Sequence, residues 1–399
     1  MKWAILLGSP DIGGGTYVIF EHAIRAKRKG IDVCIITEEK VNTERLNWHP
    51  EARELTWMTI ESAKTSEFDI VIATWWRTVY EMYKLKANTY AYFVQSIESR
   101  FYPENEIPLR KLVDSTYMLP LKIITEATWI KSYLKENYNK DAYLVLNGIR
   151  KDIYSECGQA HEKRNSGRLR VLVEGPVDVK FKNVPKTIEL CKKSLADEIW
   201  LLTSSPVKSY PGVNRVYSRV PIFETPMIYR SCDVVIKLSY VEGMFGPPLE
   251  MFHCGGTAIT YNVTGHDEYI KNGYNALVAN TDDENAVVNF INDLKNDKSI
   301  LEKLKNGSKD TAEIWPNWDE AAIKFENVVN QICLSESLGQ AEIEKSSKFF
   351  FDFYVIAENY RLSKINNTYY KKCKTILSNK FPILYTKLRN LKFKIKYSG

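Results

Sequence analysis

Residues 232–278 read CDVVIKLSYVEGMFGPPLEMFHCGGTAITYNVTGHDEYIKNGYNALV. The largely apolar stretch Asp233–Leu238 is typical of a parallel strand that is buried on both faces of a sheet. A polar loop with Glu242 follows, and Pro247-Pro248 then predicts the start of a helix, because the first helical turn does not use the N–H that proline lacks. We expect Glu250 to lie in the first turn of that helix.

The two glutamates, Glu242 and Glu250, can hold one ligand at two points. A carboxylate accepts two hydrogen bonds and therefore suits a vicinal diol. The N–H groups of Phe245 and Gly246 at the helix start can face the oxygens of a sugar or a phosphate. In the alternative interpretation, Glu250 only stabilises the helix N-terminus and Glu242 is solvated. The charge spacing alone favours this alternative.

Short apolar runs alternate with helical patterns on both sides of this stretch. In the first half, strands are predicted at Lys2–Leu7, Asp32–Thr37, Asp69–Thr74, Thr89–Gln95, Lys122–Thr125 and Ala142–Leu146. After a polar linker, strands are predicted at Leu169–Glu174, Glu198–Ser204, Val213–Ser218, Asp233–Leu238, Thr257–Tyr261 and Ala276–Ala279. Two successive α/β blocks predict two doubly wound, Rossmann-like domains that face each other across a cleft.

A glycine loop follows the first predicted strand. It reads Gly8-Ser9-Pro10-Asp11-Ile12-Gly13-Gly14-Gly15 and leads into a helical pattern. Glycine lets backbone N–H groups approach a phosphate closely, and the helix N-terminus adds partial positive charge. The spacing matches neither the dinucleotide fingerprint nor the Walker loop. A tight strand-to-helix turn without a ligand is the alternative.

Several motifs together resemble the retaining GT-B glycosyltransferases of family 4. Two of these motifs are the Glu-x7-Glu spacing with Phe-Gly inside it and the glycine loop. A third is Asn147-Gly148-Ile149 with Tyr154, although Arg150 stands where the family has an acidic residue. The segments 264–268 and 273–278 and the helical pattern Trp315–Cys333 follow in the same order. The resemblance covers about residues 1–335 and implies the GT-B architecture, with a nucleotide-sugar donor and retention of anomeric configuration.

A narrower resemblance concerns bacterial polysaccharide glycosyltransferases of the rhamnan-synthesis type. It is carried by residues 73–75, 92–98 and 101–103, although Ser96 and Ile97 depart from the motif. It implies that Trp75, Gln95 and Glu98 lie on the acceptor side. Packing in the core or the cleft wall is the alternative for the aromatic residues.

The resemblance also implies roles for individual donor-side residues. Glu242 would hold hydroxyls of the donor sugar, Glu250 would hold the ribose diol, and Gly14 and Gly15 would lie against the diphosphate. Pro176 follows Gly175 where an arginine is expected, so Lys182 is the predicted diphosphate ligand, with Lys180 as the alternative. The predicted catalytic residues are Glu242 and Lys182; the predicted donor-binding residues are Gly14, Gly15, Lys180, Phe245, Gly246 and Glu250.

No metal or cofactor is expected, because the sequence has no Asp-x-Asp motif and its cysteines and histidines lack metal-ligand spacing. Lysine and backbone dipoles would take the metal's place. The resulting prediction is a hexosyl- or deoxyhexosyl-transferase acting on a saccharide or lipid-linked acceptor in bacterial cell-surface polysaccharide synthesis. A sugar-nucleotide epimerase of the same fold, a non-catalytic glycan- or nucleotide-binding scaffold and a two-domain oxidoreductase are the alternatives.

The charge is divided unevenly along the chain. Residues 361–399 hold 11 Lys/Arg and no Asp/Glu, whereas the rest hold 44 Lys/Arg against 49 Asp/Glu. Aromatic residues interleaved with these lysines favour an anionic membrane surface as a partner. A solvated basic tail is the alternative. Because the rest of the chain has no second basic element, no nucleic-acid partner is expected.

The sequence shows no signal peptide and no apolar run of 18 residues. We therefore expect a cytoplasmic protein, peripheral at the inner face of the cell membrane. The expected organisation is an acceptor-side domain at 1–155, a linker at 156–168, a nucleotide-sugar domain at 169–315, a helix crossing back at 316–335, and a basic aromatic tail at 336–399.

Overall fold

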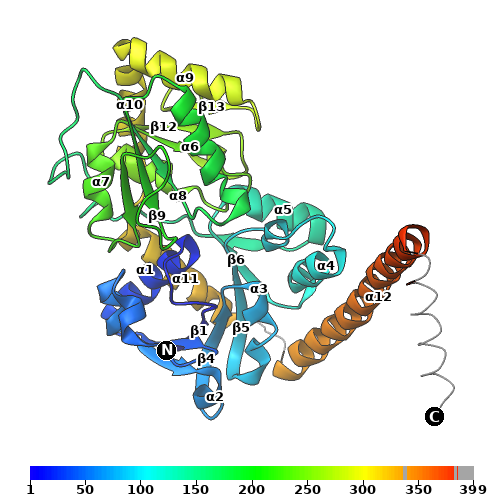
Figure 1. Cartoon of the computed structure of the whole chain (residues 1–399). Coiled ribbons are helices and arrows are strands. Elements are labelled where there is room, and N and C mark those ends of the chain that lie inside the picture. Colours follow the sequence, from blue (N-terminus) through cyan, green and yellow to red (C-terminus); the bar gives the residue numbers. More distant parts are fainter. Residues whose placement is uncertain (336–338, 382–383, 385–399) are drawn as a thin grey trace.

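The computed structural model describes residues 1–335, 339–381 and 384. In this part of the chain the strands form two separate sheets, one of seven strands and one of six, and every strand pair is parallel. The sheets form the cores of two domains that lie one above the other in Figure 1. The predicted fold class, two Rossmann-like α/β domains in the GT-B arrangement, is therefore confirmed.

The first sheet has the strand order β3-β2-β1-β4-β5-β6-β7. Its strands are β1 (Lys2–Leu6), β2 (Asp32–Thr37), β3 (Thr56–Thr59), β4 (Glu67–Ala73), β5 (Lys86–Val94), β6 (Lys122–Thr125) and β7 (Ala142–Leu144). Apolar residues of one sheet face pack with α1 (Gly14–Arg28) and α11 (Trp318–Leu334). The other face packs with α4 (Ile107–Ser115) and α5 (Thr128–Tyr138), and also with the short α2 (Ile60–Ala63) and α3 (Trp76–Val79).

The second sheet has the strand order β10-β9-β8-β11-β12-β13. Its strands are β8 (Arg170–Glu174), β9 (Glu198–Thr203), β10 (Arg215–Ser218), β11 (Val234–Lys237), β12 (Thr257–Tyr261) and β13 (Ala276–Ala279). The helices α6 (Val184–Lys193) and α9 (Glu284–Asn296) cover one face. The helices α7 (Thr225–Ser231) and α8 (Gly246–His253) cover the other, and α10 (Lys298–Ile314) contributes to both cores.

The predicted strands agree with the observed ones to within three residues at either end. The edge strand Thr56–Thr59 was not predicted. Its sequence, TWMT, is short and only partly buried, so it lacks the continuous apolar run that marks the central strands. Residues 156–168 connect the two domains without a regular helix or strand.

The chain returns to the first domain through α11. Phe325 and Val329 of this helix pack into the core around α1, and Trp318 donates a hydrogen bond through Nε1 to the Tyr17 hydroxyl at 3.0 Å. The segment Asn147-Gly148 packs directly against the residues before α11. A Cβ on Gly148 would lie only 2.4 Å from the Asn317 backbone. Glycine is therefore required where the two segments cross.

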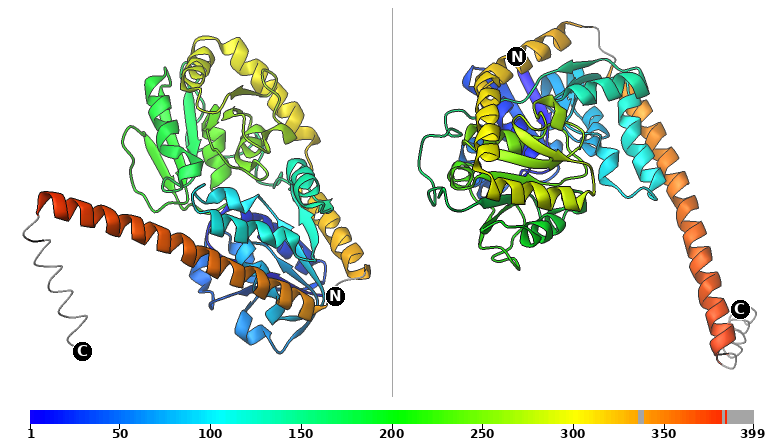
Figure 2. Two further views of the ribbon diagram at one scale, coloured as in Figure 1. Left: turned by 90° about the vertical axis from the view of Figure 1, so that its right-hand side faces the viewer. Right: turned by 90° about the horizontal axis from the view of Figure 1, so that it is seen from above.

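The predicted tail contains a long helix, α12 (Gln340–Lys380). Its first turns pack on the first domain, where Ile343 is buried and Phe350 and Tyr354 contact the core beside α4. The later part of the helix projects away from both domains, as the two views of Figure 2 show. The basic residues from 385 to 399 lie outside the described residues.

Candidate active site

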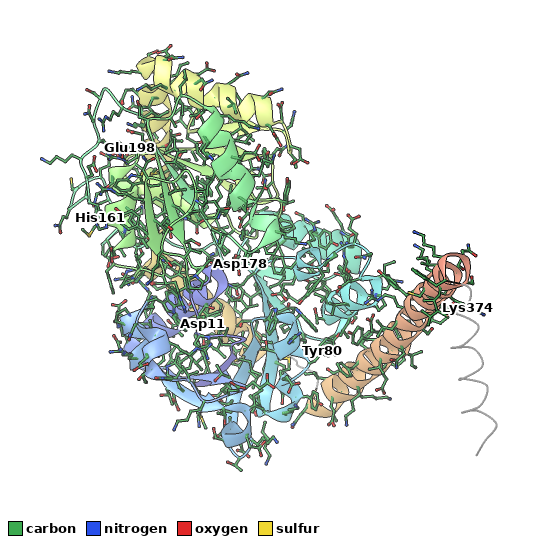
Figure 3. All side chains as sticks on the ribbon, in the orientation of Figure 1. Asp11, Tyr80, His161, Asp178, Glu198 and Lys374 are labelled. Carbon is green, nitrogen blue, oxygen red and sulfur yellow. The ribbon has the colours of Figure 1, made fainter. Side chains whose placement is uncertain are left out.

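A cavity of about 470 Å³ lies between the two domains. The carboxyl ends of several strands supply its walls: Gln95 follows β5, Glu126 follows β6, Glu174 ends β8 and Lys237 ends β11. Ligands of open α/β sheets bind at this edge, and the volume lies in the usual range for a small-molecule site. Asp11 and Asp178, on the loops after β1 and β8, are labelled at the level where the domains meet in Figure 3.

Most of the predicted site residues line this cavity, although they come from distant parts of the sequence. Those that line it are Gly14, Gly15, Gln95, Glu98, Lys182, Glu242, Gly246 and Glu250. Trp75, Lys180 and Phe245 are not among its lining residues. Lys180 is exposed, Phe245 is buried in the core of the second domain, and Trp75 packs against Gly8 and Trp76.

The glycine loop forms one wall of the cavity. The helix α1 begins at Gly14, so its first turn faces the cavity with unpaired backbone N–H groups. A Cβ on Gly14 would meet no atom within 4 Å, whereas a Cβ on Gly15 would lie 2.9 Å from Gln95 Oε1. Gln95 also donates a hydrogen bond to the Gly15 carbonyl at 3.2 Å. The turn therefore leaves open space beside a helix N-terminus, where an anion is favoured.

Lys182 and Glu242 form an ion pair in the cavity. Lys182 Nζ lies 2.9 and 2.8 Å from the two carboxylate oxygens of Glu242. Lys182 ends a short 3-10 turn, and Asn183 follows with a left-handed φ of 55° and then α6, which has proline near its start. This local geometry directs Lys182 into the cavity and leaves Lys180 outside it.

A second lysine, Lys237, also lies close to Glu242. Its Nζ contacts the Glu174 carboxylate and lies 3.8 Å from Glu242 Oε1, although the side chain is only 3% exposed. Burial alone would raise the pKa of Glu242, but the charges of Lys182 and Lys237 outweigh it and hold that pKa below its ordinary value. Lys237 was not predicted as a site residue, and the signal available in the sequence was a charged residue within an otherwise apolar strand.

Glu250 lines the cavity from α8. Because this helix begins at Gly246, Glu250 lies in the second turn, and the prediction of a first-turn position was wrong. Enclosure by the protein raises the pKa of Glu250 to about 7, while hydrogen bonds from Tyr229 and Tyr154 act in the opposite direction. A ligand that donates hydrogen bonds to such a poorly solvated carboxylate stabilises its ionised form.

The loop between the two glutamates differs in one respect from the prediction. The Gly246 N–H donates a hydrogen bond to the Met244 carbonyl at 3.1 Å, so it is not free for a ligand in this structure. Phe245 is fully buried, and its carbonyl accepts a hydrogen bond from the Tyr269 hydroxyl. Phe245 therefore anchors the loop to the second domain, and its side chain lies in the core.

Two buried carboxyl groups line the first domain's side of the cavity. Glu98 accepts hydrogen bonds from the Trp76 N–H at 2.7 Å and the Tyr92 hydroxyl at 3.0 Å, and burial raises its pKa to about 8. Glu126 accepts from Asn147 Nδ2 at 3.0 Å, and burial raises its pKa to about 7. Glu126 was not predicted as a site residue, since nothing in its local sequence distinguishes it.

Direct contacts hold the two domains together around the Glu242 loop. Met244 donates its N–H to Glu126 at 3.2 Å, and Trp129 Nε1 donates to the Gly243 carbonyl at 2.9 Å. Glu268 accepts from the Thr128 N–H at 2.9 Å and from its hydroxyl at 2.6 Å. The ring of Phe101 stacks on that of Phe181 at 4.9 Å, across the domain boundary. These contacts fix Glu242 relative to the glycine loop.

One group of side chains outside the cavity is of the kind that can bind a metal ion. Ligand atoms of Glu21, His49 and Glu51 lie within 4.8 Å of one another. Arg150 places its guanidinium 2.6 Å from Glu51 and 3.5 Å from Glu21, and it also pairs with Asp152. A cation thus already neutralises the cluster, and Arg150 stands there for a structural reason, in the position where the family resemblance implies an acid.

Comparisons with known proteins agree with this architecture. Residues 214–311 match the family model described as Glycosyl transferases group 1. Over 213 residues the chain is 23% identical to an uncharacterized glycosyltransferase of Methanocaldococcus jannaschii, a match that spans 53% of this chain and 60% of that protein. The chain therefore covers less than two thirds of that relative.

Similar solved structures include a sucrose-phosphate synthase from Thermosynechococcus elongatus, with a TM-score of 0.67 and 15% identity over 83% of this chain and 99% of that one. Another is Anabaena HepE in complex with UDP and glucose, with a TM-score of 0.67 and 13% identity over 83% of this chain and all of that one. The two-domain fold and the matched segment together support a GT-B glycosyltransferase.

Proposed function

We propose that the protein is a retaining, metal-independent glycosyltransferase of family 4. It would transfer a hexosyl or deoxyhexosyl group from a nucleotide-diphosphate sugar to a saccharide or a lipid-linked saccharide, in bacterial cell-surface polysaccharide synthesis. The observation that carries the proposal is the arrangement of Lys182, Glu242, Glu250 and the N-terminus of α1 around one interdomain cavity. These groups match the parts of a nucleotide sugar: diphosphate, sugar hydroxyls and ribose diol.

Catalysis in this proposal depends on stabilising the leaving diphosphate. The bond from the anomeric carbon to the phosphate oxygen breaks, and a bond from that carbon to the acceptor oxygen forms on the same face. The acceptor proton passes to the departing phosphate. Lys182 and the backbone N–H groups of α1 stabilise the charge that develops, and such fixed groups are most effective in a water-excluded cavity. Glu242 releases Lys182 and turns to the sugar hydroxyls.

The acceptor would enter from the side of the first domain. Gln95 and Glu98 line the cavity there, and the stacked rings of Phe101 and Phe181 form part of its wall. In Anabaena HepE, the solved complexes contain UDP, glucose or UDP-glucose. UDP-glucose is accordingly the first donor to try with this chain.

Calorimetry with UDP, GDP and dTDP tests donor binding directly. The proposal predicts that one of them binds and that Glu250→Gln weakens this binding. An oxidoreductase would bind NAD instead, and a scaffold with a vestigial cavity would bind none of the nucleotides. An epimerase would bind the nucleotide but release free sugar without any acceptor.

We also propose that α12 and the basic residues after it bring the enzyme to the inner face of the membrane. The projecting part of α12 exposes Tyr360, Tyr369 and Ile376, and Phe381 directly after the helix is also exposed. Lys374 is labelled on this helix in Figure 3. Aromatic rings suit the headgroup layer, and each lysine near an anionic leaflet contributes about 1 kcal/mol. Among the described helices, none is long and apolar enough to cross a membrane.

Vesicle sedimentation tests this membrane proposal. The full chain should sediment with anionic but not neutral vesicles, and high salt should release it. A chain ending at Tyr360 keeps Ile343 and Tyr354 in the core and should lose sedimentation while it still binds the nucleotide. A full-length variant with the 11 basic residues of 361–399 changed to glutamine is the matched control. Equal sedimentation of all three would contradict the proposal.

A further inference from the structure

Lys237 is a buried cavity residue to which the mechanism above gives no role. It ends β11, whose other residues are Val234, Val235 and Ile236, and it is 3% exposed while it lines the cavity. Lysine is almost never buried to this degree unless it is paired, and a buried ion pair rarely stabilises a fold more than apolar residues of the same volume. Fold stability alone therefore gives a poor account of a lysine here.

The amine of Lys237 and the Cβ of Lys182 both lie close to Gly175. Gly175 has a φ of +136°, and a Cβ placed on it would lie 3.8 Å from Lys237 Nζ and 3.7 Å from Lys182 Cβ. The two lysines, which are 55 residues apart in the sequence, therefore lie at the same corner of the cavity.

The Glu242 carboxylate marks a point where both ammonium groups reach one anion. Glu242 Oε1 lies 2.9 Å from Lys182 Nζ and 3.8 Å from Lys237 Nζ. A nucleotide sugar would bring a diphosphate with two negative charges into a corner that already holds Glu174 and Glu242. With the diphosphate bound, Lys182 and Lys237 would face four negative charges in this corner, so removal of either lysine would leave a larger uncompensated charge.

We propose that Lys237 is a second cationic ligand of the donor diphosphate, acting with Lys182. This proposal rests on the proposed function. As the donor enters, the two ammonium groups exchange the Glu242 carboxylate for phosphate oxygens, and Glu242 becomes available to the sugar. Lys237 stays fixed because its stem is buried in the sheet and Glu174 holds its amine. No bond to Lys237 forms or breaks in this exchange.

Calorimetry with UDP and UMP, GDP and GMP, and dTDP and dTMP tests the proposal. The wild type should bind one diphosphate more tightly than its monophosphate. Lys237→Met should reduce this preference about tenfold to a hundredfold, the usual range for one charge-assisted contact, and Lys237→Arg should retain most of it. The matched control is Lys305→Met, since Lys305 forms another shielded pair, 3.1 Å from Asp233, outside the cavity lining. Its preference should equal that of the wild type.

A folded Lys237→Met protein with an unchanged diphosphate preference would overturn the proposal and leave Lys237 a structural role. If Lys237→Met does not fold, Glu174→Gln decides, because it frees the Lys237 amine from its nearest carboxylate. The diphosphate preference should then increase, and an unchanged preference would again overturn the proposal. A wild type that binds none of the six nucleotides would instead refute the proposed function itself.

Discussion

Donor binding should become about tenfold tighter between pH 6 and pH 8 because Glu250 ionises in this range. The pKa of Glu250 is about 7, raised mainly by its enclosure. The carboxyl group is therefore about one tenth ionised at pH 6 and about nine tenths at pH 8. Only the ionised form accepts two hydrogen bonds from a ribose diol at full strength. Affinity should rise with pH by at most tenfold per unit and level off above pH 8.

The assay is calorimetry with UDP-glucose or whichever nucleotide sugar binds. A nucleotide sugar is preferable to the free diphosphate because its phosphates do not ionise between pH 6 and pH 8. Glu250→Gln should bind more weakly at pH 8 and lose the pH dependence. Glu126 provides a matched control, since its pKa is also about 7 but it faces the cavity from the first domain.

Glu126→Gln should keep the pH dependence of the wild type, whatever its absolute affinity. A Glu250→Gln protein that retains the full pH dependence would contradict this role of Glu250. A wild-type affinity that is constant between pH 6 and pH 8 would also contradict it, because Glu250 would then not contact the donor.

Three further predictions concern Lys182, Glu242 and His22. Lys182→Ala should slow turnover and weaken diphosphate binding more than monophosphate binding, by about 1.5–3 kcal/mol for a charge-assisted contact, and Lys180→Ala should leave both unchanged in the same calorimetry. Glu242→Ala should reduce kcat more than affinity for the bare nucleotide, and steady-state kinetics beside calorimetry would expose an equal loss in both. Burial and Arg25 lower the pKa of His22 in the folded protein from 6.5 to about 3. The unfolded chain therefore takes up a proton at His22 at a higher pH than the folded protein, and the free energy of unfolding should fall as the pH drops below 6.5. Denaturant titrations of His22→Phe should show a shallower fall.

The fold could be predicted from the sequence because its signals are local. Runs such as Ile70–Ala73 are apolar throughout, which distinguishes strands covered on both faces, and their alternation with helical patterns indicates parallel sheets. The strand Thr56–Thr59 was missed because an edge strand carries polar residues and depends on its neighbour β2 for pairing. The helix α12 was missed because a high density of basic residues predicts that a segment is exposed, but it does not predict the backbone conformation of that segment.

The candidate site could be predicted only in part, because its contacts join distant residues. The charge spacing alone did not favour a ligand at Glu242 and Glu250; the family resemblance implied their roles and favoured Lys182, before Asn183, over Lys180. Glu126 and Lys237 acquire their surroundings only when β6, β8 and β11 assemble, so local patterns do not reveal them. The ion pair between Lys182 and Glu242 spans 60 residues and was likewise not visible in the sequence.

The most direct test of the account is incubation of the full chain with a panel of nucleotide sugars, with and without saccharide or lipid-linked acceptors. The readouts are nucleoside diphosphate release and the anomeric configuration of the product by NMR. The account predicts acceptor-dependent release from one donor, a product that retains the donor's configuration, and loss of both in Glu242→Ala. An inverted product would contradict the retaining mechanism, and the absence of release from every donor and acceptor pair would contradict glycosyl transfer itself.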